Sequence, residues 1–331
     1  MLIDRLPALL KKLMFTTGVS GREDKIREVI KGLVEPYADE IVTDPVGNLI
    51  VRKKGNGKKI MFCAHMDEIG FFATYITNDG YIKVSTVGGI NTLSAAFSEV
   101  VSENGVYGVL VPESSKEKPE IDGMFIDIGV KSKKDAQRRV SVGDYFVCAP
   151  SIRKLGGKKY VGRPFDDRVG CAVLIEALMG TQKTDNDLYF VFSTQEEVGG
   201  RGSKPASHTV GADYGIVVDV TSTGDKPGSP TMNVALGKGC TVKVKDAGVI
   251  SSPQLVKRIK ELIKEKGDIK YQDELLVHGG TDASSMQVAG HGAQVSGVSI
   301  PTAYIHSGVE MIDLNDVCEA VKLLILIGER L

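Results

Sequence analysis

Three short, nearly continuous apolar runs constrain the fold of this chain more than any other feature of its sequence. They cover residues 59–64, 188–193 and 214–220. A strand with one face in solvent alternates apolar and polar residues, whereas a strand buried on both faces of a parallel sheet is apolar throughout. The runs therefore predict an α/β fold with a mostly parallel sheet flanked by helices.

Between about residues 70 and 160 the sequence changes to short β-rich runs separated by turn residues. The tripeptides at 78–80 (Asn-Asp-Gly) and 103–105 (Glu-Asn-Gly) are hairpin signals, because Asp-Gly and Asn-Gly supply the positive φ angles of tight hairpin turns. This segment predicts a small all-β, barrel-like domain. We expect the charged stretch at 114–120 to be a loop tip.

After residue 162 the α/β pattern returns. Apolar periodicity predicts a helix over 168–179 and a closing helix over 313–330, and a further strand is expected over 233–245. We therefore expect a discontinuous α/β domain, residues 1–69 and 161–331, with the all-β segment, residues 70–160, inserted into it.

The charge balance argues against two classes of partner. The chain of 331 residues carries 41 basic and 42 acidic side chains, a net charge of −1, so no overall field attracts nucleic acid or an anionic membrane. No apolar run reaches the roughly 20 residues that span a bilayer. The five cysteines are scattered and form no CxxC pair, which favours a cytoplasmic protein with reduced thiols and no structural thiolate site.

Polar residues gather where the predicted strands end and the next segments begin. In open α/β sheets, ligands bind beyond the carboxyl ends of the strands. Singly, each such residue has an ordinary interpretation as a core histidine, a helix N-cap or a solvated loop acid. Together they would place two imidazoles and several mutually repelling carboxylates at one edge, which requires cations nearby. The set is His65, Asp67, Asp166, Asp167, Glu196, Glu197, Asp219 and His306.

A pair of divalent cations would satisfy this set. Two-metal sites need a bridging carboxylate, terminal imidazole and carboxylate ligands, and an exposed water. Imidazole with carboxylate and no thiolate favours Zn²⁺, or related ions such as Co²⁺ or Mn²⁺. Glu196 and Glu197 are adjacent and point in different directions on an extended backbone, so one can bind a metal while the other reaches the water. Asp67 is placed to hold the other ring nitrogen of His65.

Six motifs, in order along the chain, resemble those of the co-catalytic metalloaminopeptidases that form tetrahedral particles. This family includes glutamyl and deblocking aminopeptidases, and some members carry an older endoglucanase label. The similarity runs from about Val19 to the C-terminus and includes the position of the inserted β domain. The motifs are 64–70 (Ala-His-Met-Asp-Glu-Ile-Gly), 165–170 (Phe-Asp-Asp-Arg-Val-Gly), 195–199 (Gln-Glu-Glu-Val-Gly), 219–221 (Asp-Val-Thr), 279–283 (Gly-Gly-Thr-Asp-Ala) and 304–307 (Tyr-Ile-His-Ser).

The resemblance implies a hydrolase that removes N-terminal residues from peptides, with two Zn²⁺ or Co²⁺ ions in each subunit. It assigns His65 and Glu197 to different metals, and Asp219 and His306 complete the two metal sites. It makes Asp166, rather than Asp167, the bridging ligand, because the first Asp of the pair aligns with the family's bridging residue. It also implies that Glu196 is the general base and that Asp67 orients His65.

The resemblance further implies that the inserted domain mediates dimer contacts and assembly of a homo-oligomer, often a dodecamer built from dimers. Only peptides would then reach the enclosed sites. One departure concerns specificity, because Ala303 stands where many relatives carry Arg. The basic residues Arg201, Lys204 and Lys238 are candidates for a preference for acidic substrates.

Two other functions remain open at this level. A glycoside hydrolase would use two carboxylates about 5 to 9.5 Å apart across a sugar, but the chain has no Trp and only 6% aromatic residues to form a sugar platform. A catalytically silent peptide-binding assembly protein would keep the fold without the chemistry. The presence of every expected ligand and of the base argues against it.

Overall fold

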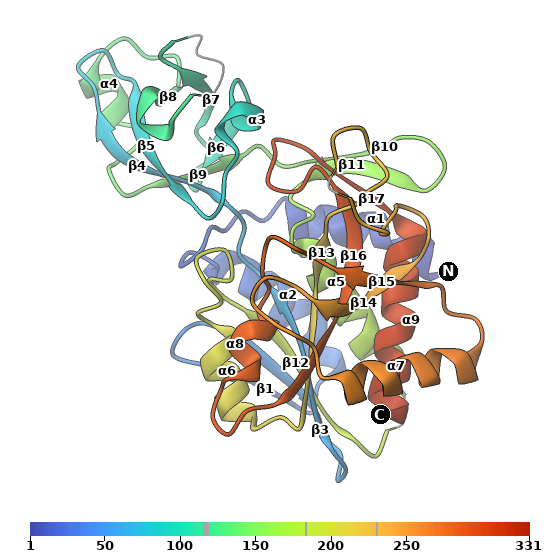
Figure 1. The fold of residues 1–331 in the computed structure, drawn as a ribbon. Helices are drawn as coiled ribbons and strands as arrows, with labels where there is room; N and C mark the ends of the chain where they lie inside the picture. Colours follow the sequence, from blue (N-terminus) through green and yellow to red (C-terminus); the bar gives the residue numbers. More distant parts are fainter. Residues whose placement is uncertain (115–118, 183, 230) are drawn as a thin grey trace.

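The computed structural model describes residues 1–114, 119–182, 184–229 and 231–331. Its largest element is an 11-stranded sheet with the order β1-β2-β12-β3-β13-β16-β17-β11-β10, and β14 pairs with both β15 and β16 (Figure 1). The strands are β1 (Glu40–Thr43), β2 (Leu49–Lys53), β3 (Lys59–His65), β10 (Ser151–Lys154), β11 (Lys159–Arg163), β12 (Asp187–Ser193), β13 (Tyr214–Thr221), β14 (Cys240–Lys245), β15 (Tyr271–Leu275), β16 (Gln294–Ala303) and β17 (Glu310–Asp313).

The three apolar runs form the centre of this sheet, as predicted. They correspond to β3, β12 and β13: β3 lies between the other two and pairs in parallel with both, and β13 also pairs in parallel with β16. Every residue of β12 is buried. The expected α/β fold class is therefore confirmed.

Helices cover both faces of the sheet. One face carries α1 (Leu2–Met14), α2 (Asp24–Val34), α5 (Arg168–Gly180), α7 (Pro253–Lys266) and α9 (Leu314–Arg330), which share the main hydrophobic core with the strands. The other face carries α6 (Ser203–Val210) and α8 (Ala283–Gln287), whose apolar side chains pack with those of β3, β12 and β13. A short 3₁₀ turn, η1 (Glu35–Tyr37), follows α2.

The β-rich segment forms a closed six-stranded barrel in the order β4-β5-β8-β7-β6-β9, a separate lobe in Figure 1. Both predicted hairpin turns are present, with Gly80 and Gly105 at φ values of 90° and 80°. The barrel has its own apolar core. Its elements are β4 (Gly70–Ile76), β5 (Ile82–Val87), α3 (Thr92–Ala95), β6 (Glu99–Ser102), β7 (Tyr107–Pro112), η2 (Ile121–Gly123), β8 (Met124–Asp127), α4 (Lys133–Gln137) and β9 (Tyr145–Cys148).

Three local expectations differ from the structure or fall outside it. The strand expected over 233–245 begins only at Cys240, because Gly237 and Gly239 adopt positive φ values of 80° and 102° and turn the chain. Strand β10 lies inside the segment assigned to the inserted domain, yet it pairs with β11 of the large sheet. The loop expected at 114–120 falls mainly on residues 115–118, outside the described residues.

Within the described ranges, none of the helices combines the length and the apolar composition that crossing a bilayer requires.

The parallel strands bring the predicted polar residues to one edge of the sheet. Ser193 at the end of β12 pairs in register with His65 at the end of β3, and β13 next to β3 carries Asp219 near its own end. Segments more than 100 residues apart in sequence therefore deliver their side chains to the same place.

Candidate metal centre

A cavity of about 560 Å³ opens at this edge of the sheet. Glycines from three different loops, Gly89, Gly199 and Gly280, also contribute to its wall. Asp67 and Asp167 are not part of the lining; both lie fully buried behind it. The predicted site residues that line the cavity are His65, Asp166, Glu196, Glu197, Asp219 and His306.

Asp166 lies between the two imidazoles. Its Oδ1 is 3.1 Å from His65 Nε2, and its Oδ2 is 3.1 Å from His306 Nε2. His306 Nε2 is also 3.2 Å from Glu197 Oε2, and His65 Nε2 is 3.9 Å from Asp219 Oδ1. The cluster thus divides into two halves, each with one imidazole and one further carboxylate, and Asp166 faces both.

The backbone of Asp67 fixes the tautomer of His65. Its Nδ1 lies 3.0 Å from the backbone carbonyl oxygen of Asp67, which can only accept a hydrogen bond, so Nδ1 carries the proton. In the neutral ring, Nε2 then points an unprotonated lone pair into the cavity, as a metal ligand must. The carboxylate of Asp67 is farther from this nitrogen, at 3.5 Å.

The donor set fits divalent cations. In two groups of three residues, the possible ligand atoms lie within 4.8 Å of one another: His65 with Asp166 and Glu197, and His65 with Asp167 and Asp219. The Oε1 atom of Glu197 is buried and makes no hydrogen bond to the described part of the chain. A buried carboxylate oxygen of this kind requires a partner, and a cation supplies one.

The two neighbouring aspartates have different surroundings. Asp167 caps helix α5: its Oδ1 accepts a hydrogen bond from the N–H of Gly170 at 3.0 Å, and its Oδ2 accepts one from the N–H of His65 at 3.3 Å. Asp166 instead directs both oxygens at the imidazoles. Asp166 is therefore the better placed of the two to be shared by two cations.

The directions of the pKa shifts in the cluster indicate that additional positive charge would stabilise it. Burial and the charge of neighbouring carboxylates such as Asp166 raise the pKa of Asp219 well above its usual range, and burial does the same to the pKa of Glu196. Burial lowers the pKa of His306, but Asp166 and Glu197 outweigh it and raise that pKa to about 11. The cluster without cations therefore retains protons that divalent ions can replace.

A tight turn carries Glu196 and Glu197 into the cavity. Gln195 adopts a φ of 57°, an uncommon conformation for a residue with a side chain. The carboxylate of Asp67 accepts hydrogen bonds from the next two amides, those of Glu196 at 3.0 Å and Glu197 at 3.2 Å, and from the hydroxyl of Ser20 at 2.6 Å. Asp67 thus holds both the ring of His65, through its backbone, and the turn, through its side chain.

A buried ion pair that no sequence pattern marked joins two of the loops. Glu310 accepts hydrogen bonds from the backbone N–H groups of Phe165 and Asp166. Arg163 lies 3.4 Å from Glu310 and donates to the carbonyl of Ser307, next to His306. Neither residue lies at the end of a predicted apolar run, so no local signal marked them.

The basic residues considered for specificity do not enter the main cavity. Arg201 and Lys204 line a second cavity of about 630 Å³, which shares only Gly199 and Gly200 with the first. Ala303 is buried at the end of β16.

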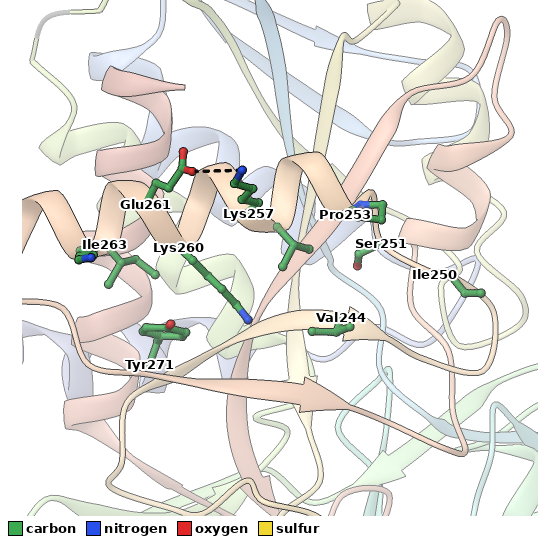
Figure 2. A pocket seen from close by; sticks show the side chains of 11 residues that line it. Val244, Ile250, Ser251, Pro253, Lys257, Lys260, Glu261, Ile263 and Tyr271 are labelled. Carbon is green, nitrogen blue, oxygen red and sulfur yellow. Dashed lines mark ion pairs between the residues drawn. The ribbon is translucent and has the colours of Figure 1, made fainter.

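A larger groove of about 840 Å³ lies under helix α7 and has a different character (Figure 2). Val244 and Tyr271 form part of its apolar wall, and Lys257 on its rim pairs with Glu261 at 4.0 Å. The residues that line it include no histidine or cysteine. Of these three cavities, the one of about 560 Å³ at the sheet edge contains the clustered imidazoles and carboxylates that could perform catalysis.

The comparisons with known proteins agree with this geometry. The sequence pattern of the family described as M42 glutamyl aminopeptidase matches residues 47–323. A putative aminopeptidase of Acetivibrio thermocellus is 43% identical to this chain over 320 residues, 96% of each sequence.

Two solved structures share the fold over nearly the whole chain. An aminopeptidase from the archaeon Desulfurococcus kamchatkensis superposes with a TM-score of 0.96 at 33% identity, covering 99% of this chain and 96% of that chain. The TET1 peptidase of Pyrococcus horikoshii, which can assemble into a tetrahedron or a large octahedral shell, gives 0.86 at 32% identity and 100% coverage of both chains. Together with the matched pattern, these similarities show that the chain is an aminopeptidase and belongs to the M42 glutamyl aminopeptidase family of metallopeptidases.

Proposed function

We propose that this aminopeptidase uses two divalent cations and Glu196 as general base to hydrolyse the first peptide bond of its substrates. The observation that carries the proposal is the position of Asp166, 3.1 Å from an imidazole on either side, in the cavity that Glu196 also lines. In this assignment His65 and Asp219 hold one cation, His306 and Glu197 hold the other, and Asp166 is shared.

The cations, Zn²⁺ or Co²⁺, would supply Lewis acidity that acidifies a water molecule and polarises the scissile carbonyl. Glu196 takes the proton of the attacking water and passes it to the leaving amine. Glu197, one residue further along the turn, serves as a ligand. Asp67 supports both roles, because its carboxylate holds the amides of both residues.

A panel of aminoacyl-anilides tests the reaction class and the metal requirement together. Enzyme stripped with a chelator should lose nearly all turnover and regain it with Zn²⁺, Co²⁺ or Mn²⁺, because the water is too weak an acid without a cation. Cellulose is the control substrate in the same preparation. Cellulose hydrolysis without anilide hydrolysis would support the glycoside hydrolase alternative, which the aminopeptidase relatives do not favour.

A chain that binds no cation at neutral pH and turns over no peptide would instead be a silent peptide-binding protein. The buried, unsatisfied oxygen of Glu197 weighs against that outcome, because an empty site would leave it without a partner.

The division into a catalytic domain, 1–69 and 161–331, and an assembly domain, 70–160, is also part of this proposal, with strand β10 near the end of the second segment joined to the large sheet through β11. The barrel exposes large apolar side chains, including Phe97 (70% exposed) and Tyr107 (58%), which suit a surface buried between subunits. A homo-oligomer, such as a dodecamer built from dimers, would cover them. The five free cysteines suit a cytoplasmic location.

Placing a charge on the barrel tests the assembly proposal. Phe97→Glu should shift the particle to smaller species in analytical ultracentrifugation, because it would bury an unpaired carboxylate between subunits. Phe97→Tyr, which keeps the aromatic ring, should retain the wild-type size. An unchanged particle in Phe97→Glu would remove Phe97 from the subunit interface.

A further inference from the structure

The side chain of Glu23 is buried near the metal centre and has no assigned role. Glu23 immediately precedes helix α2, where an acid could cap its own helix, but it makes no such bond. Its side chain turns instead to a loop 172 residues away, where Oε1 accepts a hydrogen bond from the N–H of Gln195 at 3.0 Å. The same oxygen accepts one from the N–H of Gly21 at 2.8 Å.

This contact completes a cradle around the turn that carries the proposed general base. Three successive amides donate to two buried carboxylates: Gln195 to Glu23, and Glu196 and Glu197 to Asp67. Two carbonyls of the turn accept hydrogen bonds within the loop: that of Glu196 from Gly199 at 2.8 Å and from Gly200 at 3.0 Å, and that of Gln195 from Arg201 at 3.2 Å. The three amides are instead held by the carboxylates of Glu23 and Asp67, which reach the turn from distant segments.

The backbone conformation of Gln195 makes this contact important for the direction of Glu196. Its φ of 57° is disfavoured for any residue with a Cβ, so the surroundings must impose it. Rotation at Gln195 would swing the next residue, Glu196, away from its present direction. Burying Glu23 beside the carboxylate of Asp67 is itself unfavourable and raises the pKa of Glu23 to about 7. Because burial of Glu23 is unfavourable here, its hydrogen bonds to Gln195 and Gly21 are expected to have a specific role.

We propose that Glu23 is a positioning residue for the general base: it holds the left-handed backbone of Gln195 and thereby aims Glu196 into the cavity. This inference rests on the proposed role of Glu196. In this assignment Glu23 contacts neither the cations nor the substrate.

Asp316 offers a matched control far along the chain. It too is a buried carboxylate that accepts two backbone hydrogen bonds, from Gly237 and Gly239 at 2.7 Å each, and burial raises its pKa to about 7. Asp316 holds a turn that lies outside the lining of the candidate cavity. Removing either side chain deprives two amides of their acceptor.

The test compares Glu23→Ala, Glu23→Gln and Asp316→Ala as cation-loaded full-length proteins. For Glu23→Ala we expect kcat on an aminoacyl-anilide to fall by about 10- to 100-fold, because small displacements of a catalytic group have effects of this size. KM and cation content should stay within about threefold of wild type, since the ligands keep their own supports. Glu23→Gln retains an acceptor oxygen, so its kcat should stay close to that of wild type. Asp316→Ala should have a lower melting temperature but an unchanged kcat.

Three outcomes of this comparison would overturn the inference. An equal fall of kcat in Asp316→Ala would make the effect one of general stability, and loss of cations in Glu23→Ala would place its effect on the metal centre. A kcat of Glu23→Gln as low as that of Glu23→Ala would contradict the hydrogen-bond role. If Glu23→Ala does not fold, Glu23→Asp, whose shorter side chain withdraws the acceptor, takes its place, and an unchanged kcat would count against the inference.

Hydrogen exchange separates this inference from the proposed function. The amide of Glu196 is bonded to Asp67, not to Glu23, so faster exchange there in Glu23→Ala, but not in Asp316→Ala, would show that Glu23 orders this part of the turn. That result would stand even if the wild type hydrolysed no anilide, which would refute the proposed function alone. Unchanged exchange at this amide would refute the positioning role.

Discussion

Glu196→Gln is expected to lower kcat by about 10²- to 10⁴-fold while leaving the cation content of the protein unchanged. Gln has nearly the same shape as Glu but cannot accept a proton from water at neutral pH. The contacts that place this residue are made by its backbone, through Asp67, and survive the change. Steady-state kinetics on an aminoacyl-anilide, combined with metal analysis of the same samples, measures both quantities.

The neighbouring Glu197 provides the control. Glu197→Gln is the same chemical change one residue away, but it alters a carboxylate whose Oε2 lies 3.2 Å from His306. We expect it to weaken cation binding, with activity partly restored by excess Zn²⁺ or Co²⁺. A Glu196→Gln protein that is fully loaded and fully active would show that another group takes the proton.

Asp166→Asn is expected to reduce cation affinity by at least about 100-fold and to abolish activity at ordinary cation concentrations. Asp166 faces both imidazoles at 3.1 Å, so its loss affects both halves of the site at once. Even residues that only support metal ligands typically contribute 10- to 100-fold in affinity, and a shared ligand should contribute more. Titration calorimetry with Zn²⁺ on chelator-stripped protein measures the change.

Asp167→Asn tests whether the effect belongs to Asp166 alone. Asn caps helices about as well as Asp, so its one acceptor oxygen can still bind the N–H of Gly170 and helix α5 should form. The N–H of His65 then loses its acceptor, so the melting temperature should fall by the effect of one buried hydrogen bond. Cation affinity should stay close to that of wild type, because both oxygens of Asp167 already accept backbone hydrogen bonds. The reverse pattern, with affinity lost in Asp167→Asn and kept in Asp166→Asn, would transfer the shared position to Asp167.

Local patterns predicted most of the secondary structure because each pattern has a local cause. The apolar runs became β3, β12 and β13, and the Asp-Gly and Asn-Gly turns became hairpins with positive φ at Gly80 and Gly105. The strand expected from residue 233 was wrong at its start, because two glycines that are compatible with a strand adopt turn conformations instead. Asp316, more than 70 residues away, accepts the hydrogen bonds that hold this turn.

The sequence by itself determined which residue types stand at the strand ends, and hence that this edge of the sheet needs positive charge. It could not decide which of two adjacent acids does what, because neighbours such as Asp166 and Asp167 have the same local context. Only the tertiary structure separates them, through partners that come from distant segments. Glu23 is the clearest case: nothing near it in sequence marks it, and its contact with Gln195 exists only because the fold brings residues 172 positions apart within 3.0 Å.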